Sequence, residues 1–383
     1  MKHLLVEGWR GISQSFAMVN QYQLYELANR PGLMLRHRDL PFEKSTWNTT
    51  DNNPGFPERM RDQIMAIPPP DRDEFDCVYS IASPFRKSAT RAGKVITFMT
   101  GEFGLRPDSF VDGAPDFEFF CGGANEVVVP SRWSKMKLME AGFPEAKVAI
   151  VPHGVNADFF SPLSSEERAA ARQQIGVKDE SFIFLNLGAM TWNKGLDVLV
   201  RAFAEVRKRH PNARLVLKDD HRLYGIAATN VIHKAFESVP ELFDDDLRAS
   251  IILLSDTLTL GQMRLLYGMA DTYVSAYRAE GFNLPVIEAM ACGTPVIVTA
   301  GGATDDFCPP LLAKQVASRQ IDCVSRGIPG SGYYLEPSPE SLVHCMEAAI
   351  AAPTDAAASA AERKKLMERY SWSACTGILA SLF

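Results

Sequence analysis

The sequence predicts an α/β protein made of two Rossmann-like, doubly wound domains that face each other across a cleft. Short apolar runs of strand length alternate with longer patterns of helix length, which is typical of parallel sheets covered by helices on both faces. The alternation occurs twice along the chain, and 383 residues are enough for two such domains. A disordered or fibrous protein is excluded, because 46% of the residues are hydrophobic and only 22% are charged.

The first series of elements occupies about the first 150 residues. The apolar runs that predict its strands are 4–6, 77–81, 95–99, 126–129 and 148–151. Helical patterns at 15–29 and 133–141 lie between them. Residues 40–72 are rich in Pro, Asn and charge and carry little periodic signal, so we expect a long loop there.

The second series follows a linker that we place at 152–156, just before Ser161 and Pro162. The runs that predict its strands are 182–187, 214–217, 251–254, 272–275 and 295–299, with helical patterns at 196–208 and 260–269. The predicted domains are 1–160 and 161–365, and a C-terminal helix, 366–383, returns to the first. Ligands of such sheets bind at the carboxyl ends of the strands, so the chemistry is expected in loops that follow strands.

Charge and cysteine content exclude several other classes. A net charge of −6 leaves no basic excess for a nucleic-acid backbone. Seven cysteines without a C-x-x-C pair predict free, buried thiols in a reducing cytoplasm rather than disulfides or a zinc ribbon. No run reaches the roughly 18 apolar residues of a membrane-spanning helix, and the N-terminal apolar run is too short for a signal peptide. We therefore expect a cytoplasmic protein.

The most informative stretch is 279–297, AEGFNLPVIEAMACGTPVI, which follows an expected strand and opens a helix. Pro285 suits the first helical turn, and Gly281 allows a tight turn before it. Gly293, with Pro295 beyond it, suits the end of the helix. The start of a helix offers free N–H groups and a positive dipole end. The stretch therefore predicts a phosphate site.

Two carboxylates, Glu280 and Glu288, flank this predicted phosphate site. A carboxylate in such a place is suited to hydroxyl groups, such as those of ribose or a hexose, which donate charge-assisted hydrogen bonds to it. The structural alternative for Glu288 is a residue that only complements the helix dipole.

From Glu280 to Ile297 the stretch resembles the donor-binding signature of retaining GT-B glycosyltransferases of family 4. In that signature two glutamates with seven residues between them precede A-M-A-x-G-x-P-V-I. Asn283 is a departure, because the family commonly has Gly there; its side chain would lie close to the sugar and narrow donor choice. Further segments agree in order and spacing: 124–131, 148–162, 185–195, 301–305 and 371–373. The resemblance covers about 120–383 well and the first 120 residues only loosely.

The resemblance implies the GT-B fold and a hexosyltransferase of the EC 2.4 type, as used in polysaccharide biosynthesis. Such an enzyme moves a sugar from a nucleotide-diphosphate sugar to a hydroxyl of a glycan or lipid-linked saccharide and keeps the anomeric configuration. Attack is from the front side, with the diphosphate as the base. The resemblance implies no metal and no cofactor, and no D-x-D motif stands at an expected strand end.

By the same resemblance Lys194 binds the diphosphate, Glu280 contacts the donor sugar, and Glu288 holds the ribose hydroxyls. The other expected donor-binding residues are Gly11, Gly188, Lys218, Gly281, Phe282, Asn283 and Leu284. The family usually has an arginine where this chain has Ala189, so one cation is missing. Lys218 is a candidate replacement, and a surface lysine is the alternative.

The first domain is expected to bind the acceptor. Arg10 is a candidate contact to an anionic acceptor or the donor phosphate, with a structural role as the alternative. Thr100 and Glu102 follow another strand, and Thr100 stands at or near the place where the family often has a histidine. For His153 a structural role is favoured.

Two alternatives stay open at this point. The mixed basic and apolar helix at 132–139 suits either a peripheral contact with the inner face of a membrane or a buried apolar face with solvated lysines. The missing arginine and histidine also keep open a catalytically weak GT-B partner or regulatory subunit.

Overall fold

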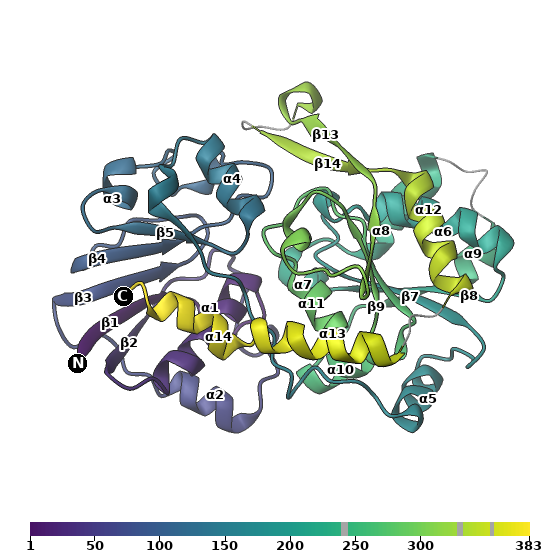
Figure 1. Cartoon of the computed structure of the whole chain (residues 1–383), viewed down its shortest axis with the longest axis horizontal. Helices are drawn as coiled ribbons and strands as arrows, with labels where there is room; N and C mark the ends of the chain where they lie inside the picture. The colour runs from purple at the N-terminus through teal and green to yellow at the C-terminus, as the bar shows by residue number, and fades with distance from the viewer. Residues whose placement is uncertain (239–243, 328–331, 353–355) are drawn as a thin grey trace. The chain divides into compact units, whose positions relative to one another are not determined.

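The computed structural model describes residues 1–238, 244–327, 332–352 and 356–383. The chain forms two compact units, and each combines segments that are distant in sequence (Figure 1). The first unit comprises Met1–Gly154, Asp322–Tyr333 and Arg369–Phe383, and the second comprises Val155–Ile321 and Tyr334–Glu368. Residues 322–333 therefore belong with the first unit, although the predicted boundaries assign them to the second domain.

The first unit is built on a six-stranded parallel sheet in the order β2-β1-β3-β4-β5-β6. Its strands are β1 (Lys2–Gly8), β2 (Leu33–Asp39), β3 (Glu74–Ile81), β4 (Arg91–Phe98), β5 (Glu126–Val129) and β6 (Val148–Ile150). The sequence patterns predict all of these except β2. That strand lies at the edge of the sheet, and its short apolar run, Leu33–Leu35, is followed at once by three charged or titratable side chains, Arg36, His37 and Arg38.

Helices cover both faces of this sheet. They are α1 (Ser15–Ala28), α2 (Glu58–Met65), α3 (Phe117–Cys121), α4 (Arg132–Glu140) and α14 (Trp372–Ala380). On one face the Tyr79 hydroxyl donates to Gln23 of α1 at 2.9 Å. On the other face Phe119 of α3 packs against the cluster that contains Leu5 and Val78. This two-sided cover is the reason that consecutive apolar residues, such as Leu4–Val6 in β1, fill the inner part of the central strands.

The prediction of a loop over all of 40–72 is wrong, because α2 lies within this segment. The helix has only eight residues and follows Pro57. Only Met60 and Ile64 are buried, one turn apart, which gives too short an apolar pattern to stand out in the sequence.

The second unit has its own six-stranded parallel sheet, in the order β12-β11-β10-β7-β8-β9. Its strands are β7 (Phe182–Gly188), β8 (Ala213–Asp219), β9 (Ile251–Leu254), β10 (Thr272–Ser275), β11 (Val296–Thr299) and β12 (Ala313–Val316). Two further strands, β13 (Ser318–Asp322) and β14 (Tyr333–Pro337), pair with each other. β12, β13 and β14 are not predicted, because polar residues interrupt them.

Helices also cover both faces of the second sheet. Those between residues 155 and 369 are α5 (Ser165–Gln174), α6 (Leu196–Arg209), α7 (His221–Tyr224), α8 (Ala228–Ser238), α9 (Asp245–Ala249), α10 (Leu260–Met269), α11 (Leu284–Ala291), α12 (Pro339–Ala351) and α13 (Ala356–Arg369). Phe184 and Val274 belong to a core cluster with residues of α6 and α12. Tyr273 contacts Tyr267 of α10, with ring centroids 5.9 Å apart.

Tyr333 is held against α4 by an aromatic contact with a buried lysine. The Lys137 side chain is fully buried, and its Nζ lies 3.2 Å from the centroid of the Tyr333 ring and 4.6 Å from that of Trp133. Its ammonium also pairs with Glu140 at 3.1 Å. The expectation of solvated lysines on this helix is therefore wrong for Lys137, whose charge is satisfied by the ring faces and by one carboxylate.

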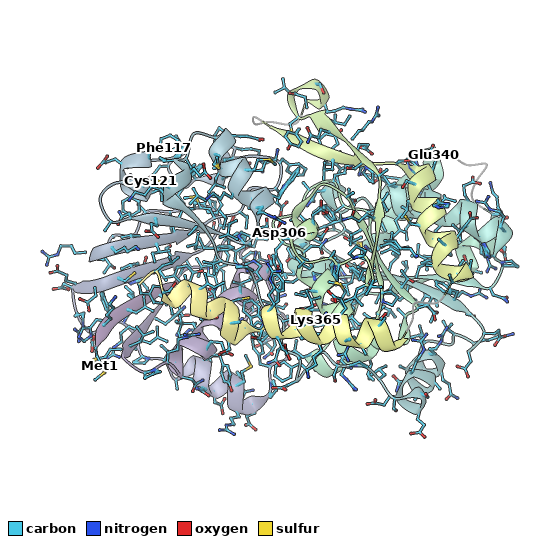
Figure 2. All side chains as sticks on the ribbon, viewed as in Figure 1. Met1, Phe117, Cys121, Asp306, Glu340 and Lys365 are labelled. Carbon is cyan, nitrogen blue, oxygen red and sulfur yellow. The ribbon has the colours of Figure 1, made fainter. Side chains whose placement is uncertain are left out.

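The seven cysteines are free and buried, as predicted; Cys121 of α3 is labelled in Figure 2. In the described ranges of the chain, every helix is too short or too polar to cross a bilayer.

Candidate functional site

The loops that follow β7 and β10 meet at the carboxyl edge of the second sheet and bring Lys194 to Glu280. The Nζ of Lys194 lies 2.5 Å from Oε1 of Glu280. The Glu280 side chain is 7% exposed and that of Lys194 is 25% exposed, so the pair reaches solvent mainly through the lysine. Asn193 links the same two loops, because its Nδ2 donates to the Ala279 carbonyl at 3.1 Å and its own carbonyl accepts from the N–H of Arg278 at 2.7 Å.

A glycine is required where these loops touch. Gly195 has φ 67°, and a Cβ at this position would lie 1.8 Å from the carbonyl oxygen of Ala276. Both the left-handed backbone and the close approach exclude a side chain. Gly195 therefore sets how closely Lys194 approaches the loop that carries Glu280.

Arg278, which the sequence reasoning did not single out, fixes this pair of loops. Its guanidinium is buried and forms two-pronged ion pairs with Asp197 at 2.7 and 2.9 Å and with Glu336 at 3.0 Å. It also donates to the backbone carbonyl of Trp192 at 3.0 Å, and its Cζ lies 4.5 Å from the centroid of the Trp192 ring. An arginine between apolar residues, two positions before Glu280, is the signal that could have drawn attention to it.

Helix α11 begins as the sequence predicts but turns at a different residue. Pro285 is in its first turn, and no side chain caps its N-terminus. The left-handed residue at this turn is Asn283, with φ 79°, and not Gly281. Asn283 is buried, and its Nδ2 donates to Oγ of Ser275 at 3.0 Å. The side chain thus contacts the carboxyl end of β10, and its expected approach to the sugar stays a prediction.

The neighbouring predicted residues have structural contacts of their own. Phe282 is buried and stacks on Phe307, with ring centroids 4.7 Å apart. Gly281 is buried and Leu284 is half-buried. At the other end of α11, the N–H of Gly293 and that of Thr294 donate to the carbonyls of Met290 and Ala289 at 3.0 Å, which closes the helix as expected.

Glu288 is the second carboxylate of the predicted site and faces the hydroxyl of Tyr267. This hydroxyl donates to Oε2 of Glu288 at 2.7 Å. Burial raises the pKa of Glu288 to about 7, and the hydrogen bond from Tyr267 opposes that rise. Tyr267 was not predicted; it lies 21 residues earlier in the chain, and only the fold brings the two groups together.

Lys218 lies at the same edge of the second sheet as the loop after β7, where Ala189 stands in the place of the expected arginine. In the sheet register it is paired with Leu187, one residue before Gly188 and two before Ala189. Its side chain is buried, and its Nζ donates to the Asp219 carbonyl. Burial lowers the pKa of Lys218, while Asp220 and Asp219 oppose that change. The position fits the predicted role, but in this structure the amine is turned toward the backbone.

Arg10, in the first unit, makes the contacts expected of a residue with a structural role. It is buried, and Nε and Nη2 bind the two oxygens of Asp39 at 2.9 and 2.5 Å. Its Nη1 donates to the carbonyls of Ile64 and Ile67. Burial alone would raise the pKa of Asp39, but hydrogen bonds from Arg10 and His37 hold this pKa well below its usual range. Arg10 thus fixes β2 and the end of α2 to the loop after β1.

The remaining predicted residues of the first unit lie in the loops after β1 and β4. Gly11 has φ 79°, and a Cβ there would lie 2.7 Å from Cγ2 of Thr49, so residues of the 40–57 segment cover this glycine. Thr100 and Glu102 are half-buried. The Glu102 carbonyl accepts a hydrogen bond from Nε1 of Trp133 at 2.9 Å.

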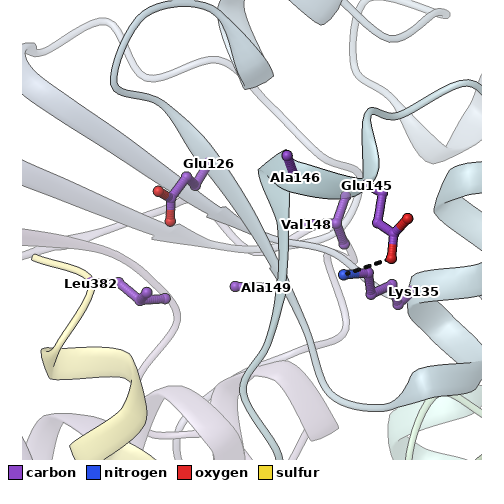
Figure 3. Close-up of a pocket in the computed structure, with 7 residues that line it drawn as sticks. All are labelled: Glu126, Lys135, Glu145, Ala146, Val148, Ala149 and Leu382. Atoms are coloured by element: carbon purple, nitrogen blue, oxygen red, sulfur yellow. Dashed lines mark ion pairs between the residues drawn. The ribbon is translucent and has the colours of Figure 1, made fainter.

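A surface depression of the first unit lies apart from all of these residues (Figure 3). Its lining comprises Glu126, Lys135, Glu145, Ala146, Val148, Ala149 and Leu382. Lys135 and Glu145 form an ion pair at 4.0 Å on one side of it. In the part of the chain that the structure describes, no three His, Cys, Asp or Glu side chains are grouped as metal ligands.

Comparison with known sequences places residues 167–308, which contain Lys194, Lys218, Glu280 and Glu288, in the family model described as Glycosyl transferases group 1. An uncharacterized glycosyltransferase of Methanocaldococcus jannaschii is 34% identical over 164 residues, which are 42% of this chain and 38% of that protein. The mannosylfructose-phosphate synthase of Agrobacterium fabrum is 32% identical over 161 residues, 42% of this chain and 34% of that enzyme. The chain thus spans little more than a third of these relatives.

Solved structures resemble the chain over its whole length. Anabaena HepE, solved in complex with UDP and glucose, matches with a TM-score of 0.68 and 14% identity over 100% of this chain and 99% of that one. At this identity the likeness shows the fold. The chain has the GT-B fold, in which both domains are Rossmann-like, and the predicted fold class is confirmed.

Proposed function

We propose that this protein is a retaining glycosyltransferase of family 4 that moves a sugar from a nucleotide-diphosphate sugar to a hydroxyl of a glycan or lipid-linked saccharide. The observation that carries the proposal is the contact between Lys194 and Glu280 at the carboxyl edge of the second sheet. A cation and a carboxylate with a hydroxyl-binding role are the two groups that a donor composed of a diphosphate and a sugar requires.

Lys194 acts on the leaving group in this proposal. Negative charge grows on the diphosphate oxygen as the bond to the sugar breaks, and a fixed cation there stabilises the transition state. Glu280 accepts hydrogen bonds from the sugar hydroxyls and Glu288 accepts those of the ribose. Lys218 supplies a second positive charge, and the uncapped start of α11 adds a helix dipole. With these groups the reaction needs no metal.

The proposed acceptor site lies in the first unit, around the loops that carry Gly11, Thr100 and Glu102. Arg10 is left out of it, because its donors are engaged by Asp39 and two backbone carbonyls. Gly11 in the first of these loops stays a proposed donor-side residue, and Thr49 of the 40–57 segment lies against its turn.

A panel of UDP-, GDP- and ADP-sugars tests the proposal. Thermal shift finds the nucleotide that binds, and release of free nucleoside diphosphate in the presence of EDTA reports metal-independent turnover. NMR of the product then gives the anomeric configuration, which should match that of the donor. A protein that binds a nucleotide but releases no diphosphate would instead fit the catalytically weak partner subunit, and inversion of the configuration would contradict the retaining mechanism.

A further inference from the structure

Tyr267 is a buried residue whose polar group faces the proposed ribose-binding carboxylate. Its side chain has no exposed area, and its hydroxyl lies 2.7 Å from Oε2 of Glu288. The second oxygen, Oε1, receives no hydrogen bond from the residues that the structure describes, and Glu288 is only half-buried. One carboxylate oxygen is thus fixed from within the protein, and the other is free to receive a ligand hydroxyl.

The ring of Tyr267 is itself held in place. Its centroid lies 5.9 Å from those of both Phe160 and Tyr273, in edge-to-face arrangements. Its backbone carbonyl accepts from Oγ1 of Thr294, just beyond the end of α11, at 2.7 Å. The hydroxyl therefore comes from a side chain with little freedom, and α10 and α11 are joined both through it and through the backbone of the same residue.

We propose that Tyr267 is a positioning residue that fixes one oxygen of Glu288, so that the other is presented to the vicinal diol of the donor's ribose. This inference rests on the proposed function. Without the hydroxyl, the carboxylate gains rotational freedom that must be lost again when the diol binds. A protein without this hydroxyl should therefore bind the ribose diol more weakly, while its contacts with the rest of the nucleotide stay the same.

Binding of UDP and GDP and of their 2′,3′-dideoxy forms to the full chain tests this role by calorimetry. Tyr267→Phe should weaken binding of the ribonucleotide by about five- to tenfold, within the cost of ordering one side chain on binding. The dideoxy form should change by less than about twofold, because it offers no diol. Tyr273→Phe is the matched control; it removes a buried hydroxyl that bonds to the Leu187 carbonyl at 3.3 Å, and both ligands should stay within about twofold.

A double-mutant cycle separates positioning from general damage to the fold. In a Glu288→Ala background no carboxylate remains to be fixed, so Tyr267→Phe should add less than about twofold to the loss for the ribonucleotide. Unchanged ribonucleotide affinity in Tyr267→Phe, equal losses for both ligand forms, or additive losses in the cycle would each overturn the inference. A wild-type protein that binds none of UDP, GDP and ADP would overturn the proposed function, and the inference with it.

Discussion

At the scale of single residues, the proposed chemistry depends on where the side-chain amines of Lys194 and Lys218 lie. Lys194 reaches Glu280 directly, whereas Lys218 is buried and donates to the Asp219 carbonyl. The sequence identifies both as candidates, but it cannot show which way either side chain turns. The same limit applies to Arg10, because its partner Asp39 lies 29 residues away in a strand that the sequence patterns do not predict.

Replacing each lysine by alanine should rank their contributions to leaving-group stabilisation. Lys194→Ala should lower turnover by about a hundredfold or more, the usual effect of removing a fixed group that stabilises transition-state charge. Lys218→Ala should lower turnover by a smaller factor. The measurement is release of nucleoside diphosphate at saturating donor. Unchanged turnover in Lys218→Ala would show that this lysine does not replace the arginine missing at Ala189.

The raised pKa of Glu288 predicts a pH-dependent effect on stability. The folded protein binds the proton with a pKa of about 7, above the usual value of 4.5, so the folding contribution of this group is lost as pH rises from 4.5 to 7. Tyr267, Tyr273 and Cys292 are the titratable groups that face it.

Glu288→Gln removes that titration. In thermal unfolding without ligand, the variant should gain stability relative to the wild type as pH rises from 5 to 8, because the cost of burying the neutral amide does not change with pH. A melting-temperature difference that is the same at both pH values would contradict the raised pKa.

At the scale of elements, helix α14 shows how the C-terminal segment is anchored in the first unit. Trp372 is buried and stacks on Tyr22 of α1, with ring centroids 4.6 Å apart. Gly154 packs against the same residue, where a Cβ would lie 2.6 Å from the backbone of Trp372. The helix therefore contributes its largest side chain to the core of the first unit.

Trp372→Ala should lower the free energy of unfolding by about 3 kcal/mol or more, because it leaves a large cavity between α14 and α1. Ile378→Ala on the same helix is the control; this side chain is 44% exposed and its loss should cost about 0.5 kcal/mol. Urea unfolding of the two variants measures both values. Similar losses in the two variants would show that α14 is not anchored through Trp372.

The elements that the sequence predicts correctly share one physical property. In strands such as β5 and β10 consecutive residues are buried, so that apolar residues follow one another, as in Val127–Val129 and in Tyr273 and Val274. The missed strand β2 and the missed helix α2 bury few residues in a regular pattern. Similarly, the motif at 279–297 predicts the start and end of α11. It does not show that Asn283, rather than Gly281, has the left-handed backbone conformation at the turn before the helix.

At the scale of the whole molecule, the burial of His153 predicts that folding is sensitive to acid. It lies just before the point where the chain passes from the first unit to the second, and its ring packs between Phe98 and Trp372. Burial lowers the pKa of His153 to about 3, so the folded protein holds the ring neutral. The stability this provides is present above pH 6.5 and is lost as pH falls toward 3, because the unfolded chain takes up the proton first.

His153→Phe should therefore flatten the loss of stability between pH 6.5 and pH 4, since an apolar ring of similar shape remains without a proton to bind. Thermal unfolding of the wild type and the variant across this range measures the effect. An equally steep loss in both proteins would mean that other groups cause the acid sensitivity.

The two-domain fold was predictable, whereas the contacts that complete the site were not. The donor-binding signature lies in one stretch of sequence, so resemblance alone places Glu280 and Glu288. Arg278 acts through Asp197 and Glu336, which come from two other parts of the chain. Pairings of this kind depend on tertiary structure and leave no local pattern.

The most direct test of the central claim is the steady-state kinetics of Glu280→Gln with the donor that the nucleotide-sugar panel identifies. If Glu280 binds the sugar most strongly in the transition state, kcat should fall by about a hundredfold or more while the KM for the donor changes by less than about threefold. A wild-type rate with every donor, or a loss confined to KM, would contradict the account.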